Sequence, residues 1–279
     1  VQFCPRGPVA AMPCNKVHRK ERGERIMFDV ALLWEYWPVI LKGVPTTLKM
    51  TAIAIALGIL FGLVIALIKI NKVPVLSQIC AVYVSFIRGT PLMVLLYMTY
   101  YGLPIITNAI NANHGTNLDV NSISPFTFAV TAFVVQEAAY ESEVIRAALL
   151  SVDRKEIEAA KSIGMTGFQT LIRITMPQAL VVAVPSFANS LTSLLKGTSL
   201  AFMIAVMDLM GWAKVLGGRN FHYFEAYTCA ALTYWGMVIV IGLIMRWVEK
   251  KINFYTRDVR DEDFALQEEQ ALLIEGGEH

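Results

Sequence analysis

The sequence has little charge for its length, and this scarcity argues against several classes of protein. Only 16% of its 279 residues are charged, whereas roughly 25% is usual in soluble domains. Hydrophobic residues make up 56% of the chain, which argues against disorder. A net charge of +2 gives no basis for a nucleic-acid partner. The composition therefore predicts a protein embedded in a lipid bilayer.

Cysteine and histidine are also sparse, and neither forms a recognisable site. The cysteines lack metal-like spacing, and we interpret them as unpaired: Cys4, Cys14, Cys80 and Cys229. The histidines all fall outside the expected membrane spans: His18, His114, His222 and His279. Since there is also no nucleophile elbow, we expect neither a metal site nor an enzyme.

The first 26 residues differ in texture from the rest of the chain. They hold six basic and two acidic residues and no apolar run long enough for a signal peptide. We expect a non-native or disordered basic extension, with Met27 as the true start and an interfacial helix after it. The expected division is therefore 1–26, a transmembrane domain at 27–252, and an acidic cytoplasmic tail at 253–279.

Five stretches are apolar and about long enough to cross a bilayer. The clearest lies between Lys49 and Lys69, where nineteen residues carry no charge and would span roughly 28 Å as a helix. The second is interrupted at Arg88 and Pro91, which predicts a broken helix. The run 200–206 is too short and is expected to be re-entrant or buried. The predicted spans are Thr46–Ile70, Gln78–Leu103, Pro125–Leu150, Pro177–Lys196 and Ala226–Met245.

Small residues recur at four-residue intervals in the first span, at Ala54, Gly58, Gly62 and Ala66. Such a stripe lets another helix approach closely. We favour ordinary helix packing over a dedicated dimer motif.

Lysine and arginine counts between the spans set the expected orientation. The connection 104–125 has none, whereas basic residues follow the first, third and fifth spans. Those three regions are expected in the cytoplasm. The prediction is thus an all-α, polytopic protein of about five spans, with the N-terminus outside and the C-terminus inside.

The connection 151–177 after the third span carries the most specific pattern. Asp153 with Glu156 three residues later is typical of a capping box, which predicts a helix from about Arg154. Gly164 then allows a turn before a second helical stretch that leads to Pro177. The sequence predicts a helix-turn-helix between two spans.

The spacing in this connection resembles the E-A-A signature of ABC importer permeases, the membrane subunits driven by separate ATPases. The signature residues are Glu158, Ala159, Ala160, Gly164, Ile174 and Pro177. Further motifs are similar to those of the polar amino-acid uptake group, with histidine, glutamine, arginine and cystine permeases among its members: Phe86-x-Arg88-Gly89-Thr90-Pro91, Ala139-Tyr140-x-x-Glu143-x-x-Arg146 and Lys196-x-Thr198-Ser199-Leu200. The sequence departs from the usual pattern at Met176, Ala147 and Lys155-Glu156.

The resemblance covers about residues 27–252 and implies a type I importer permease fold in a bacterial inner membrane. It implies three partners: an ABC ATPase that binds ATP and Mg²⁺, an extracytoplasmic amino-acid-binding protein, and a second permease copy or a related permease. The chain needs no cofactor of its own, and Lys196-Gly197-Thr198-Ser199 lacks the upstream glycine of a phosphate loop. The E-A-A residues would couple the permease to the ATPase.

Charged residues at membrane depth are costly and usually face a cavity or one another. We interpret Glu143 and Arg146, three residues apart, as a structural ion pair. Asp208 and Glu225 are expected near the outer side, as solvated loop charges or as contacts for the binding protein.

Other polar residues in the spans are candidates for the substrate path. Glu137 and Glu141 would hold a substrate amino group or be partners of Arg88 and Lys196, and both interpretations stay open. Arg88 would meet a substrate carboxylate or a neighbouring helix end. The candidate path comprises Arg88, Glu137, Glu141, Asn189, Lys196, Thr198 and Ser199.

Two other functions remain for comparison. A gradient-driven secondary transporter or channel would explain intramembrane charges but not the connection 151–177. A membrane enzyme lacks a catalytic constellation. Which amino acid is carried is left open by the sequence.

Overall fold

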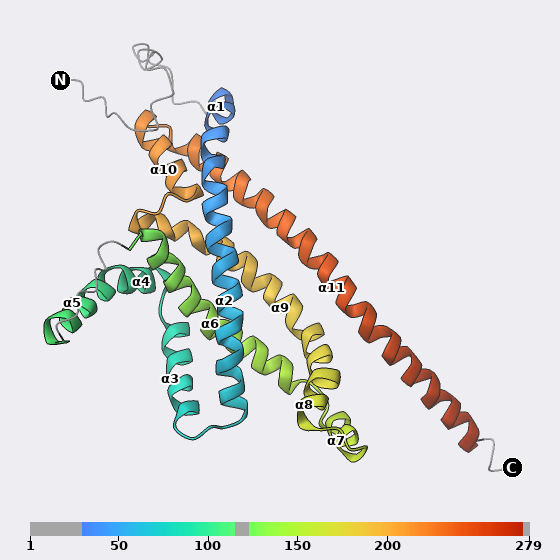
Figure 1. Ribbon diagram of the computed structural model, residues 1–279. Helices are drawn as coiled ribbons and strands as arrows, with labels where there is room; N and C mark the ends of the chain where they lie inside the picture. The colour runs from blue at the N-terminus through green and yellow to red at the C-terminus, as the bar shows by residue number, and fades with distance from the viewer. Residues whose placement is uncertain (1–29, 115–122, 276–279) are drawn as a thin grey trace, which may run out of the picture.

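We analysed a computed structural model of the chain, which describes residues 30–114 and 123–275, with side chains as far as residue 252. Helices form all the regular structure in these residues (Figure 1). The longer helices are α1 (Val30–Ile40), α2 (Val44–Ile70), α3 (Leu76–Gly89), α5 (Leu103–His114), α6 (Pro125–Leu150), α7 (Arg154–Ser162), α9 (Met176–Gly197), α10 (Leu209–Asn220) and α11 (Tyr223–Glu275). Short ones are η2 (Leu41–Gly43), α4 (Leu92–Tyr97), η3 (Met98–Gly102), α8 (Gly167–Thr170), η4 (Leu171–Thr175) and η5 (Thr198–Ile204). The expected all-α fold is confirmed.

Four segments of the described chain are long and apolar enough to cross a membrane: Val30–Ile70, Leu92–Asn113, Gly167–Ile204 and Tyr223–Ile252. The predicted third span coincides with α6, a helix of 26 residues that carries four charged side chains. The second predicted span is broken as expected, because α3 ends at Gly89 and α4 begins after Pro91. The protein is therefore a multi-pass helical membrane protein.

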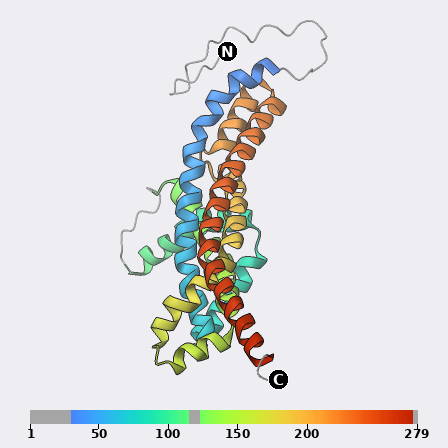
Figure 2. The same cartoon turned by 90° about the vertical axis from the view of Figure 1, so that its right-hand side faces the viewer.

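The helices run between two ends of the molecule, and different elements gather at each end. The α2–α3 connection, the α7–α8 hairpin and the C-terminal end of α11 lie at one end, which we call the hairpin end (Figures 1 and 2). Helices α1 and α10 lie at the opposite end. The basic regions that follow the first and third spans therefore lie at the same end (Figure 1), in line with the pattern on which the orientation prediction depends.

Helices α2 and α6 cross at very short range. The small residues Ala54, Gly58, Gly62 and Ala66 are all buried along α2. A Cβ atom at Gly58 would lie 2.5 Å from the Glu137 Cβ, and one at Gly62 would lie 3.0 Å from the Ser142 nitrogen. The stripe therefore packs α2 against α6 of the same chain, as ordinary helix packing predicts.

A second core forms at the end opposite the hairpin, where α1, α10 and the start of α11 meet around Tyr36, Ile40, Leu209 and Cys229. Gly43 allows this contact, because a Cβ there would lie 2.5 Å from the Leu209 Cα.

The expectation for Asp208 and Glu225 is wrong. Asp208 is fully buried, caps α10 by accepting from the Gly211 nitrogen at 2.8 Å, and accepts from the Tyr234 hydroxyl at 3.3 Å. Glu225 is 3% exposed, and one of its oxygens lies 3.4 Å from His222 Nδ1. Helix capping and the packing of α10 against α11 bury these two acids. This burial depends on tertiary contacts, which no local sequence pattern reveals.

Several other expectations concern the ends of the chain and the short apolar run. The extension 1–26 and Met27 lie outside the described residues. The acidic tail continues α11 as helix as far as Glu275. The run expected to be buried or re-entrant is the 3-10 helix η5, with Ala201 and Ile204 buried.

Candidate functional site: the hairpin and the polar residues of the helices

The hairpin between α6 and α9 begins at a capped helix. The Asp153 carboxylate accepts from the Lys155 nitrogen at 2.9 Å, which starts α7 at the predicted place. The predicted capping box is wrong, because the Glu156 carboxylate accepts a hydrogen bond from the Gln178 side chain of α9. A complete capping box instead joins Thr166 to Gln169 at the start of α8. The hairpin is thus fixed at both helix starts and tied to α9.

The turn of the hairpin depends on Gly164. Its φ angle is +88°, a region that side chains disfavour. The Met165 nitrogen donates to the Ala160 carbonyl at 3.1 Å, closing the end of α7. Nothing lies within 4 Å of a Cβ built at Gly164, so the requirement for glycine is conformational and not a matter of space.

The E-A-A residues divide between surface and interior. Glu158 and Ala159 are exposed, whereas Ala160 is only 3% exposed and packs inside the hairpin. Only one of the two alanines therefore offers a small surface to a partner. Ile174 is half-buried in η4, and Pro177 is exposed in the first turn of α9.

Two exposed hydrophobic residues flank the turn and were missed by the sequence reasoning. Ile163 is 81% exposed and Phe168 is 71% exposed. Large apolar side chains at a hairpin tip are typical of a protein contact. Their positions on either side of Gly164 were the available signal.

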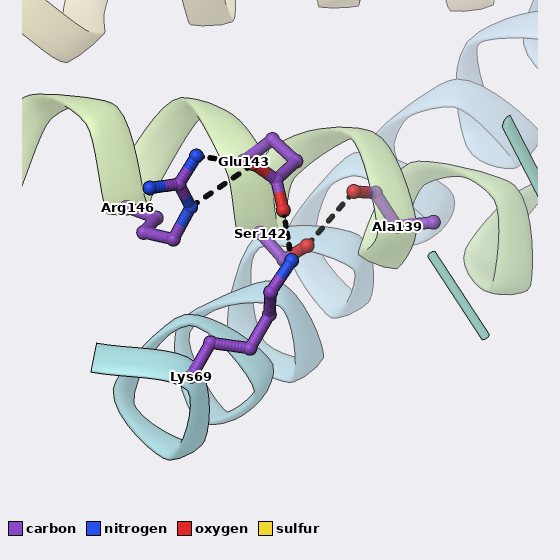
Figure 3. A network of polar contacts seen from close by, with 5 residues as sticks. All are labelled: Lys69, Ala139, Ser142, Glu143 and Arg146. Atoms are coloured by element: carbon purple, nitrogen blue, oxygen red, sulfur yellow. Dashed lines mark hydrogen bonds and ion pairs between the residues drawn. The ribbon is translucent and has the colours of Figure 1, made fainter. Parts of the chain in front are cut away.

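The expected Glu143–Arg146 pair is present and is part of a larger network (Figure 3). Arg146 donates to Glu143 Oε2 through Nε at 3.0 Å and Nη2 at 2.8 Å. The other carboxylate oxygen, Oε1, pairs with Lys69 from the end of α2. Ser142 donates to the Ala139 carbonyl at 2.8 Å beside it. One carboxylate therefore joins α2 to α6 a short distance before the hairpin, and Lys69 was missed because it lies 74 residues away in sequence.

Glu137 and Glu141 lie on the face of α6 that packs against α2. Glu137 is 4% exposed and Glu141 is fully buried. Among the described residues, one Glu137 oxygen and both Glu141 oxygens form no hydrogen bond of normal geometry. Ser190 of α9 lies beside Glu141. The interpretation that these acids partner Arg88 and Lys196 is wrong, because neither basic residue forms an ion pair with them.

The remaining candidate path residues do not converge on the two acids. Asn189 and Lys196 are exposed along one face of α9. Thr198 is fully buried and donates to the Leu195 carbonyl at 2.7 Å, so its hydroxyl is already used. Ser199 is half-buried. Arg88 is exposed, and its guanidinium carbon lies 5.4 Å from the centroid of the Tyr140 ring.

A multi-pass helical protein with a rigidly capped hairpin between two of its long helices has the architecture of a membrane permease. Residues 58–254 match the family described as the binding-protein-dependent transport system inner membrane component. The chain belongs to this family.

Curated relatives are similar over most of the chain. The probable amino-acid ABC transporter permease protein PatM of Vibrio harveyi is 38% identical over 81% of this chain and 97% of its own length. The L-cystine transport system permease protein TcyL of Bacillus subtilis is 37% identical over 81% of this chain and 92% of its own. The resemblance to permeases of the polar amino-acid uptake group is confirmed.

Solved structures share the fold. A chain from an amino acid ABC transporter crystallised with histidines matches with a TM-score of 0.69 at 30% identity, covering 81% of this chain and all of that one. A chain of the inward-facing MetNI methionine ABC transporter matches with a TM-score of 0.61 at 19% identity, covering 81% of this chain and 99% of that one. The predicted permease fold is confirmed.

Proposed function

We propose that the protein is the permease subunit of an ATP-driven importer that carries polar amino acids across a bacterial inner membrane. The observation that carries the proposal is the hairpin, with capped helix starts, a Gly164 turn at φ +88° and an exposed tip. The amino-acid substrate class rests on the names of the relatives. A gradient-driven transporter has no use for such a hairpin.

The hairpin would dock into a separate ABC ATPase. Exposed Glu158 offers a carboxylate for a charge-assisted hydrogen bond, and exposed Ala159 allows close approach. Ile163 and Phe168 would add the apolar contact. When two ATPase subunits close on ATP and Mg²⁺, the hairpins would move together and tilt the attached helices, opening the cavity to alternate sides. ATP chemistry then belongs to the partner, and this chain needs no cofactor.

The remaining partners follow from the same function. A substrate-binding protein would deliver the amino acid at the end opposite the hairpin. Because one hairpin serves one ATPase subunit, a second copy of this chain or a related permease would complete the transporter.

The substrate path would follow the exposed polar residues. Asn189 and Lys196 line one face of α9, Ser199 follows them, and Arg88 ends α3. The buried acids Glu137 and Glu141 would join the path only if α9 moves away from α2 and α6 during transport.

The test compares two glycines that both have open space around them, Gly164 and Gly167. Gly164→Val forces a β-branched side chain into a positive-φ conformation, at a cost of about 1–3 kcal/mol that favours another turn. We expect ATP-dependent amino-acid uptake to fall at least about tenfold in vesicles containing the ATPase and binding protein, a change equivalent to about 1.4 kcal/mol.

Gly167→Val is the matched control, because Gly167 begins α8 without a positive φ, and its uptake is expected to stay near that of the unaltered protein. Full uptake by Gly164→Val at a normal membrane level would contradict the coupling role. Gradient-driven uptake by this chain without an ATPase would support the secondary transporter instead.

A further inference from the structure

A pocket of about 520 Å³ opens between α3 and α6, at Arg88 of the proposed substrate path. Its polar lining comes from Lys69, Ser85, Arg88, Tyr140 and Glu143, together with the backbone of Gly89. The helices that form it are held by a buried contact of Val84 and Ile87 with Ala139. The pocket is therefore a fixed feature of the helix arrangement.

The charges around the pocket are unevenly matched. Both oxygens of Glu143 are occupied, one by Lys69 and the other by Arg146. In the part of the chain that the structure describes, the Arg88 guanidinium has no carboxylate partner and no hydrogen bond, and only the Tyr140 ring lies beside it. Arg88 is therefore a charged group in this pocket whose donors are unused among the described residues.

The C-terminal end of α3 places backbone carbonyl groups, which carry partial negative charge, next to the positively charged Arg88. The Thr90 backbone N–H donates a hydrogen bond to the Ile87 carbonyl at 3.2 Å, and its hydroxyl donates one to the Phe86 carbonyl at 2.7 Å. Pro91 has no N–H, and among the described residues no backbone donor reaches the carbonyls of Arg88 and Gly89. Carbonyls at a helix C-terminus carry partial negative charge, which favours a cation.

We propose that this pocket binds the zwitterionic head group of an α-amino acid, with the carboxylate on the Arg88 guanidinium and the ammonium at the carbonyls that end α3. The proposal rests on the proposed function and names the part of the substrate that is recognised. A guanidinium held by an aromatic ring presents a planar fork of donors, which matches a carboxylate in two places. Glu143 does not repel the carboxylate, because two cations already neutralise it.

The same geometry separates this pocket from the buried acids. Glu137 and Glu141 face the α2 glycines and are sealed from solvent, whereas Tyr140 and Glu143 line the pocket. The amino-acid side chain would then meet Val84 and Ala81 without a charged partner. Recognition of the head group alone predicts tolerance of several side chains.

The experiment measures equilibrium binding to the permease–ATPase complex in nanodiscs without the binding protein, which would otherwise contribute its own recognition. The probes are the L-amino acid taken up fastest by the complete transporter, chosen from the twenty standard ones and L-cystine, and the methyl ester of that amino acid. The ester keeps the ammonium and side chain but lacks the carboxylate. We expect the unaltered complex to bind the acid at least about tenfold more tightly than the ester, since a hydrogen-bonded charge pair is lost.

Arg88→Gln should remove this preference, so that acid and ester bind within about twofold of each other, equivalent to less than about 0.5 kcal/mol. Arg88→Lys should keep part of it, because the charge remains but the fork is lost. Lys72→Gln is the control, since Lys72 is an exposed cation in the α2–α3 connection, outside the pocket lining. It should keep the full preference.

A purely structural role for Arg88 would weaken acid and ester equally, and an unchanged acid-to-ester ratio in Arg88→Gln overturns the proposal. The proposal is also overturned if the unaltered complex shows no detectable binding of the acid at ligand concentrations on the order of 10 mM. If the complete transporter takes up no amino acid at all, the proposed function fails first, which separates the two results.

Discussion

Asp208 and Glu141 are both fully buried carboxylates, and each lies where a glycine lets two elements touch. Gly43 allows the α10 start beside Asp208 to approach, and Gly62 does the same for α6 beside Glu141. Their surroundings differ. Asp208 accepts from the Gly211 nitrogen and the Tyr234 hydroxyl, whereas neither oxygen of Glu141 forms a hydrogen bond of normal geometry among the described residues.

The difference separates an acid that stabilises the fold from one whose burial the rest of the fold must offset. A buried polar group with its partners contributes to stability, whereas one without them costs roughly 1–3 kcal/mol. Asp208 therefore anchors the end opposite the hairpin. Glu141 has only the Ser190 side chain as a polar neighbour named in the described residues, so its burial is expected to cost stability where Asp208 contributes it.

The largest effect is expected from Asp208→Ala. This change leaves the buried Gly211 nitrogen and Tyr234 hydroxyl without their acceptor and removes the cap of α10. We expect the free energy of unfolding to fall by about 2–4 kcal/mol. The melting temperature of the purified protein in detergent is the measurement. Asp208→Asn, which keeps a capping oxygen, serves as control and should lose less than half as much.

A second, smaller effect concerns pH. Burial raises the pKa of Asp208 to about 6, although hydrogen bonds from Gly211, Met210 and Tyr234 act in the opposite direction. Between about pH 4 and 6 the folded protein then holds a proton that the unfolded chain has released, so stability falls as pH rises.

The slope that Asp208 contributes is at most about 1.4 kcal/mol per pH unit, and it should be absent in Asp208→Asn. Melting temperatures of both proteins at pH 4, 5, 6 and 7 give the difference, in which other titrating groups cancel. A difference that does not change with pH would show that Asp208 does not titrate in this range.

The smallest effect is expected from Glu141→Gln. Because the carboxylate has no hydrogen bond of normal geometry to lose, the melting temperature should stay the same or rise slightly, within about 1 kcal/mol of the unaltered protein. Uptake in vesicles is measured alongside. A loss of stability comparable to that of Asp208→Ala would mean that Glu141 has a structural partner after all and would remove the contrast.

The sequence was sufficient to predict features that depend on short stretches of the chain. The α2 stripe, the break at Pro91, the Asp153 cap and the Gly164 turn each depend on residues a few positions apart, and each was predicted. The permease fold was implied by the family resemblance that these motifs carry.

Features that depend on distant residues were not predictable in this way. Lys69 joins Glu143 across 74 residues, and Asp208 meets Tyr234 only because α10 packs on α11. A local pattern also gave a wrong prediction for Glu156. Its spacing from Asp153 is that of a capping box, but its carboxylate contacts Gln178 instead. A lone acid near a span end gives no signal of whether a helix will bury it.

The close crossing of α2 and α6 has a mechanical consequence. Because Gly58 and Gly62 leave no room for one helix to slide along the other, the two would move as a single body. Helix α2, with 27 residues, is about 40 Å long at 1.5 Å per residue. A push on the hairpin that tilts α2 by about 5° around its midpoint would displace its far end by roughly 2 Å. Helix α2 would thus act as a lever that carries a small motion at one membrane face toward the other.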